Sequence, residues 1–336
     1  MTLAAVALLA ALPAAQAAST VSVAVVDSGI DATHAEFQGR TIERHSFAQP
    51  TVPVTPPVPG LPNPFDQLGN DPDGQGTAVA SKVAGRTLGQ DANATLVDLQ
   101  VSGHYTGTAL DPATEAAAAQ ALDWLLANHG SAGGAGPRVA VLSFANRTLS
   151  GPGAATLAAD AQKLWTDGVL LVVPDGPSDL AKSPYVLTVA GSEGPCAGRT
   201  SASSAPKPDL SAKSQQVTVA VPSSATSGLP TGAGTTAQKS GTPFAAATVA
   251  GIAAQMWAAN GDLPIDVLTA ILRDQAQSGG CGAGIADAGA AVAAAQSWAE
   301  PFPTGQLTKP SPAPAFALVL VAVLSVAAAR RARHRR

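Results

Sequence analysis

Short apolar runs alternate with longer amphipathic or alanine-rich segments between residues 20 and 300. Each short run is rich in β-branched residues and is bounded by polar or glycine-containing stretches, which is typical of strands buried on both faces. The predicted strands are 20–26, 94–101, 138–144, 169–173, 185–190 and 216–221. The predicted helices are 76–87, 112–128, 154–167, 242–260, 264–276 and 286–297. This alternation predicts an α/β domain, a doubly wound parallel sheet with helices on both faces.

Two further apolar segments lie near the ends of the chain. Residues 1–17 have the pattern of a secretory signal peptide, an apolar run that ends in the small-x-small site Ala15-Gln16-Ala17. Residues 313–329 form a second apolar run, which would be about 25 Å long as a helix and is followed by RRARHRR. Such arginines mark the cytoplasmic side of a transmembrane helix. A buried helix at 1–17 and a cleaved C-terminal sorting signal remain alternatives.

These segments predict an anchored protein of the cell membrane that crosses it once, with an extracytoplasmic domain. The expected parts are a signal peptide at 1–17, the α/β domain at 18–299, a Pro-rich stalk at 300–312, a transmembrane helix at 313–329 and a basic cytoplasmic tail at 330–336.

The charge balance changes once the tail is set apart. The chain has 19 basic and 23 acidic residues, and removing the five tail arginines leaves 14 against 23, a net charge of about −9. An acidic domain repels the phosphate backbone, so we expect no nucleic-acid partner.

The two cysteines, Cys196 and Cys281, predict one disulfide in an oxidising compartment, with two free thiols as the alternative. Two cysteines without clustered histidines are too few for a zinc site. Asp71 and Asp73 form a turn sequence rather than a calcium-binding series. We therefore expect neither a metal nor a cofactor.

Three segments carry a resemblance to a known family. They read VVDSGIDATH at 25–34, DGQGTAVASKVAG at 73–85 and SGTPFAAATVAG at 240–251. They resemble the three signature blocks of the subtilases, the subtilisin-like serine peptidases. Similar segments at 94–101, 141–145, 183–191 and 282–292 follow in the family's order, so the resemblance covers about 275 residues. It implies a subtilisin-like fold and serine peptidase ancestry.

The resemblance also implies that most catalytic residues are replaced. The triad Asp is kept as Asp27, but the His position holds Gln75 and the Ser position holds Pro243. An amide neither accepts nor returns a proton near neutral pH, and proline offers neither a hydroxyl nor a backbone N–H. The oxyanion Asn position holds Pro177, or Asp175 if the alignment contains a gap. Ser143, Phe144 and Ala145 match the segment that forms one wall of the family's peptide groove.

Other residues offer no evident replacement. Ser240 is expected to be a helix N-cap, and His34, His45 and His104 are expected to be surface or packing residues. We therefore expect an inactive subtilase, a pseudoprotease that binds a peptide or protein ligand. Its layout is similar to that of the mycosins, membrane-anchored subtilases of type VII secretion systems, which implies a role in a membrane assembly. An active serine endopeptidase with relocated residues and a purely structural ectodomain are the alternatives.

Overall fold

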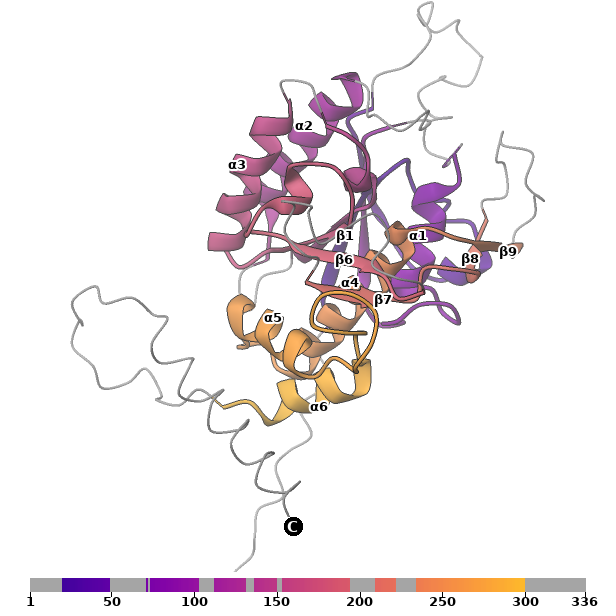
Figure 1. Ribbon diagram of the computed structural model, residues 1–336. Coiled ribbons are helices and arrows are strands. Elements are labelled where there is room, and N and C mark those ends of the chain that lie inside the picture. Colours follow the sequence, from indigo (N-terminus) through magenta and orange to yellow (C-terminus); the bar gives the residue numbers. More distant parts are fainter. Residues whose placement is uncertain are drawn as a thin grey trace, which may run out of the picture. The chain divides into compact units, whose positions relative to one another are not determined.

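Figure 1 shows the computed structural model of the chain, which describes residues 20–48, 71, 73–102, 112–130, 136–149, 153–193, 209–221 and 234–299. The chain divides into the units Met1–Trp298 and Ala299–Arg336, and nearly all described residues belong to the first. The expected signal peptide, stalk, transmembrane helix and tail lie outside the described residues. Within the described ranges, no helix is long and apolar enough to span a bilayer.

Seven parallel strands form the central sheet, in the order β2-β3-β1-β4-β5-β6-β7. Strand β1 is central: Val25 is paired with Asp98 of β3 on one side and with Val141 of β4 on the other. All six residues of β1 are buried, as expected for its apolar sequence. The strands are β1 (Ser22–Asp27), β2 (Glu43–Ser46), β3 (Thr95–Gln100), β4 (Pro137–Leu142), β5 (Leu170–Pro174), β6 (Leu187–Gly191) and β7 (Leu210–Ala212).

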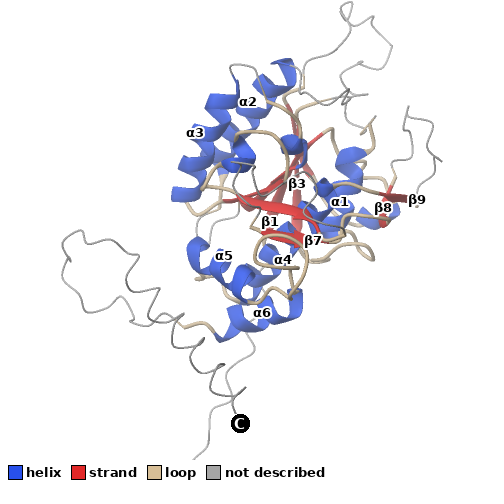
Figure 2. Ribbon diagram, in the orientation of Figure 1, coloured by secondary structure: helices blue, strands red, loops and turns tan. Residues whose placement is uncertain are grey.

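Helices cover both faces of this sheet, as Figure 2 shows. Alternate residues of β1 enter different cores, because successive side chains of a strand point to opposite faces. Val23 and Val25 pack in the core with α1, α4, α5 and α6, whereas Ala24 and Val26 pack in the core with α2 and α3. The helices are α1 (Gln75–Ala84), α2 (Pro112–Asn128), α3 (Gly153–Thr166), α4 (Thr242–Ala259), α5 (Ile265–Asp274) and α6 (Ala288–Ser297).

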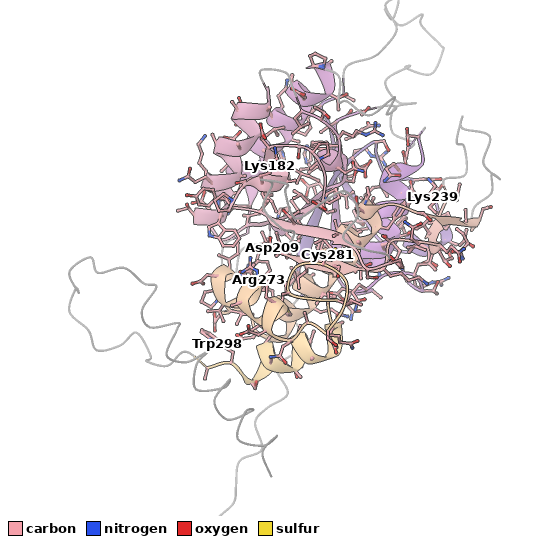
Figure 3. All side chains as sticks on the ribbon, viewed as in Figure 1. Lys182, Asp209, Lys239, Arg273, Cys281 and Trp298 are labelled. Atoms are coloured by element: carbon pink, nitrogen blue, oxygen red, sulfur yellow. The ribbon has the colours of Figure 1, made fainter. Side chains whose placement is uncertain are left out.

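The C-terminal helices are fastened to the sheet edge by polar contacts. Asp209, which precedes β7, forms an ion pair of 2.8 Å with Arg273 of α5 (Figure 3). Cys281 lies in the segment that joins α5 to α6, and its backbone N–H donates to the Ser211 hydroxyl of β7 at 3.1 Å. These contacts hold α5 and α6 beside the sheet.

The predicted α/β architecture is confirmed, with several corrections. All six predicted helices are present. The predicted strand at 216–221 is β8 (Val217–Ala220), but it pairs antiparallel with β9 (Thr236–Lys239) and lies outside the parallel sheet. The predicted strand at 138–144 ends at Leu142, and a 3₁₀ turn, η3 (Ser143–Asn146), follows it. Strands β2, β7 and β9 were not predicted, because they are only three or four residues long and two of them are largely polar.

Candidate functional site

The site begins at the carboxyl ends of the two central strands, β1 and β4. Asp27 is the last residue of β1 and is fully buried, and Ser143 directly follows β4. The Ser143 hydroxyl donates to Oδ2 of Asp27, and the Ser28 backbone N–H donates to Oδ1 at 2.7 Å. Open α/β sheets bind their ligands at this edge, where successive connections turn to opposite faces.

Burial controls the protonation of Asp27. Removal from water raises its pKa to about 8, and the neighbouring Asp71 carboxyl adds to that rise. The hydrogen bonds from Ser143 and Ser28 act in the opposite direction but are outweighed. The carboxyl is therefore mainly protonated and neutral at pH 7.

The start of α1 is fixed by a second buried carboxyl, that of Asp71. Its oxygens accept hydrogen bonds from the Ser28 hydroxyl at 2.6 Å, the Gly74 N–H at 2.8 Å and the Thr77 N–H at 2.7 Å. The Ser28 hydroxyl oxygen in turn accepts from the Gly76 N–H at 3.1 Å. This network joins the end of β1 to the first turn of α1, and so it places Gln75, the first helical residue, beside the end of β1.

The start of α4 carries Pro243, the residue that the sequence motif aligns with the family's Ser. Gly241 is the N-cap and Pro243 lies in the first turn, where a backbone N–H has no partner within the helix. Proline is therefore accommodated without loss of a helical hydrogen bond. The predicted role of Ser240 as the N-cap is wrong: it precedes Gly241, and its hydroxyl accepts from the Gln216 N–H at 3.0 Å. Gly241 has no side chain that would cap the helix.

These elements enclose a pocket of about 190 Å³. It brings together five residues that the sequence singled out, namely Gln75, Pro243, Ser143, Phe144 and Ser240. Asp27 does not line the pocket and lies behind Ser143, to which it is hydrogen-bonded. Among the described residues, the lining is Gln75, Ser143, Phe144, Asn146, Arg147, Ser240, Gly241, Pro243 and Phe244.

Asn146 and Arg147 were missed by sequence reasoning. Both are half-buried at the end of η3, beyond the three residues matched to the groove wall. The third of those three, Ala145, is fully buried; its carbonyl accepts from the Ser178 hydroxyl at 2.6 Å, and it does not line the pocket. Only a polar side chain just after a central strand could have signalled Asn146, and such a signal is weak without the fold.

The loop after β5 places neither candidate for the oxyanion position in the pocket. Pro177 is exposed and Asp175 is half-buried, and neither is among the lining residues. The Asp175 N–H donates to the Val189 carbonyl at 2.8 Å, and its own carbonyl lies 3.4 Å from the Thr242 hydroxyl. The loop therefore contacts the start of α4 through backbone atoms.

The histidines within the described residues have other partners. His34 is buried; its Nε2 lies 2.9 Å from the Thr235 carbonyl, and its Nδ1 accepts from the Glu36 N–H at 3.1 Å. His45 packs against the Trp124 ring, with centroids 4.4 Å apart. His104 lies outside the described residues. His129 follows α2, and its Nε2 lies 3.6 Å from the Asp167 carboxylate. None of these described histidines lines the pocket.

The remaining predicted positions are the cysteines and the acidic turn. Cys281 is disulfide-bonded, but Cys196 lies outside the described residues, so the pairing stays a prediction. The Asp71 carboxylate oxygens accept hydrogen bonds at the start of α1, as described above. Within the described part of the chain, no group of three or more metal-ligating side chains is present.

Comparison with known proteins agrees with this geometry. Residues 18–293 match the subtilase family of peptidases. Subtilisin-like serine protease Pen c 1 of Penicillium citrinum is 28% identical over 243 residues, 70% of this chain and 52% of that protein. The alkaline extracellular protease of Yarrowia lipolytica is 33% identical over 156 residues, 45% of this chain and 28% of that protein. The chain thus spans about half or less of these relatives.

Solved structures show the same fold. A cold-adapted subtilisin-like serine proteinase superposes with a TM-score of 0.54 at 23% identity, covering 81% of this chain and 91% of that chain. The PatG macrocyclase in complex with peptide gives a TM-score of 0.58 at 16% identity, covering 82% and 91%. The strand order, the place of Asp27 at the end of β1 and the family match over residues 18–293 lead to one conclusion: the protein belongs to the subtilase family.

Proposed function

We propose that this protein is a subtilase without peptidase activity that binds peptide segments at the pocket where its relatives carry out catalysis. The observation that carries the proposal is that Gln75 and Pro243 line one pocket at the starts of α1 and α4. Those positions hold the general base and the nucleophile in an active subtilase. Glutamine supplies no base, and proline supplies no hydroxyl.

The surroundings of Asp27 support inactivity. Both of its carboxyl oxygens accept hydrogen bonds from serine residues, and no imidazole lies against it among the described residues. In subtilisin itself, loss of Ser or His alone lowers kcat by about 2 × 10⁶. Loss of the oxyanion Asn lowers it by about 10²–10³. A chain that lacks all three groups is left without the family's chemistry, even though the separate effects do not add.

The retained pocket supports binding. Its lining includes the polar residues Gln75, Asn146 and Arg147 beside Gly241 and Pro243. Polar side chains of this kind can form hydrogen bonds with a bound peptide.

The proposal extends to location and partners. The apolar run at 313–329 and the arginines of 330–336 support a single-pass anchor, and residues 1–17 support export of the domain. A pocket held outside the membrane by such an anchor suits a protein partner in a membrane assembly.

A second candidate function rests on one specific contact. Ser143 lines the pocket and donates to the Asp27 carboxyl, so the pair has the order of a nucleophile and its base once Asp27 is ionised, above about pH 8. Asn146 supplies an amide in the same pocket. Ser143 is only 2% exposed, however, which favours a structural role for its hydroxyl.

The test uses the full-length protein in mild detergent with casein and a fluorophosphonate probe. We expect neither cleavage nor labelling. The variant Gln75→His/Pro243→Ser restores a base and a nucleophile and should gain slow labelling, whereas each single change should not. Labelling of the unmodified chain that disappears in Ser143→Ala would establish the second candidate and overturn the first.

A further inference from the structure

We propose that the pocket recognises the C-terminal carboxylate of its peptide ligand, so that the ligand ends in the pocket instead of passing through it. This inference rests on the proposed function and adds the chemical class of the ligand. Four features of the described residues support it: the charge of the lining, the neutral floor, the start of α4 and the size of the pocket.

The lining carries positive charge. Arg147 is the one charged residue among the described residues that line the pocket. A guanidinium group binds a carboxylate through two parallel hydrogen bonds, and such charge-assisted bonds are stronger than neutral ones. Gln75, Asn146 and Ser240 provide further donors around it.

A second cation lies close to the rim. Lys239 of β9 donates from Nζ to the carbonyl of Gly74 at 3.1 Å, and Gly74 directly precedes the pocket residue Gln75. Figure 3 shows Lys239 on β9, the strand that leads into the start of α4. Two cations therefore favour an anion at this end of the sheet.

The Asp27 carboxyl beneath the pocket does not repel a bound carboxylate. Asp27 lies behind Ser143, and burial raises its pKa to about 8, so it is mainly neutral at pH 7. A carboxylate in the pocket therefore meets a protonated acid instead of a second negative charge.

The start of α4 adds a favourable field. This helix has 18 residues, and Gly241 and Pro243 at its N-terminus line the pocket. A helix N-terminus carries a partial positive charge. These two residues contribute through this field and not as N–H donors, because the Gly241 N–H donates to the Ser214 carbonyl at 2.8 Å and proline has no N–H.

Size and shape distinguish a chain end from a continuous strand. A volume of about 190 Å³ lies below the roughly 300–1,000 Å³ of pockets for drug-sized ligands, so it holds about one residue. The wall at Ser143–Asn146 is a 3₁₀ turn, which does not present the regular edge that an added β-strand needs.

The experiment offers full-length protein in detergent an equimolar pool of random hexapeptides with free or amidated C-termini. Retained peptides are quantified by mass spectrometry. We expect free acids to be retained tenfold or more above amides, as suits one charge-assisted interaction. Arg147→Gln should abolish this preference and Arg147→Lys should keep part of it. The exposed Arg86→Gln serves as the matched control and should retain the full preference.

The outcomes separate the two proposals. Retention of acids and amides alike overturns the carboxylate inference and leaves peptide binding standing. Retention of amidated peptides that contain Asp or Glu overturns the assignment to the chain end, because a side-chain carboxylate then suffices. Retention of no peptide overturns both. Arg147→Gln keeps the backbone bond from residue 147 to the Phe144 carbonyl, so an unchanged thermal melt can verify its fold.

Discussion

At the scale of single residues, the start of α4 shows why a proline fits the position that the sequence motif aligns with the family's Ser. In an active subtilase the catalytic Ser lies in the first turn of a helix. Its backbone N–H helps to bind the oxyanion and has no hydrogen-bond partner within the helix. Pro243 removes both functions, yet its fixed φ suits that turn. The fold therefore accepts proline at this position, whereas the chemistry of the family requires a serine there.

Asp27, the residue that matches the triad Asp of the family, has a structural role. Its partners are Ser28 and Ser143, so its role in this chain is to join the ends of β1 and β4. A protonated carboxyl suffices for that role, since Oδ1 accepts from the Ser28 N–H and a protonated Oδ2 can donate to the Ser143 hydroxyl oxygen. This structural role gives a reason to keep Asp27 that does not depend on catalysis.

The protonation of Asp27 predicts how stability depends on pH. The folded protein holds this proton up to about pH 8, whereas the unfolded chain releases it near 3.8. Between these values the unfolded state binds fewer protons, so this group makes the free energy of unfolding fall as pH rises. Asp27→Asn does not titrate, and its amide can donate to the Ser143 hydroxyl. We expect its stability to decline less steeply from pH 4 to pH 8.

Urea unfolding at several pH values measures this difference. The exposed Asp123→Asn on α2 provides the control and should follow the unmodified protein. If the stability of Asp27→Asn shows the same pH dependence as that of the unmodified protein, Asp27 is ionised in the folded state. The proposal that the pocket lies over a neutral carboxyl would then be wrong.

At the scale of elements, α1 is pressed against the turn that follows β1. A Cβ atom at Gly76 would lie 2.0 Å from the Gly29 carbonyl oxygen, a contact with backbone that cannot rotate away. Gly76→Ala should therefore lower the free energy of unfolding by about 3 kcal/mol through overpacking. This outweighs the better helix propensity of alanine, which is about 1 kcal/mol.

Gly261→Ala is the matched control for this substitution. Gly261 follows α4, and a Cβ there would meet only the Trp257 carbonyl, at 3.9 Å. Its cost should stay within about 0.5 kcal/mol. Denaturant unfolding of both variants compares them, and equal stabilities would show that α1 can shift away from β1.

The elements also show where sequence reasoning succeeds. Helices α1 to α6 and the long apolar strands were predictable, because their apolar and alanine-rich sequences indicate burial. The polar β2 was not: its sequence ERHS gives no apolar signal, and its place comes from pairing with β3. The turn η3 was predicted as strand because Phe144 is apolar, although that side chain enters the core.

At the scale of the whole molecule, the family motifs predicted the pocket residues Gln75 and Pro243, but not Arg147. A motif locates positions that relatives share, and Arg147 lies outside every shared block. It reaches the pocket because η3 ends beside the start of α4, a proximity that exists only in the folded chain. The charge that defines our ligand proposal was therefore not accessible from the sequence.

The covalent bond of Cys281 predicts a property of the entire domain. If its partner is Cys196, the only other cysteine, the bond encloses 84 residues. A loop of that length stabilises by about 4 kcal/mol in the chain-entropy model. We expect reduction to lower the free energy of unfolding by about that amount. The double variant Cys196→Ser/Cys281→Ser should lower it equally. Denaturant unfolding measures both changes, and non-reducing peptide mapping identifies the linked residues. A link from Cys281 to a second chain would instead make the bond a contact between molecules, and reduction would then lower the apparent mass.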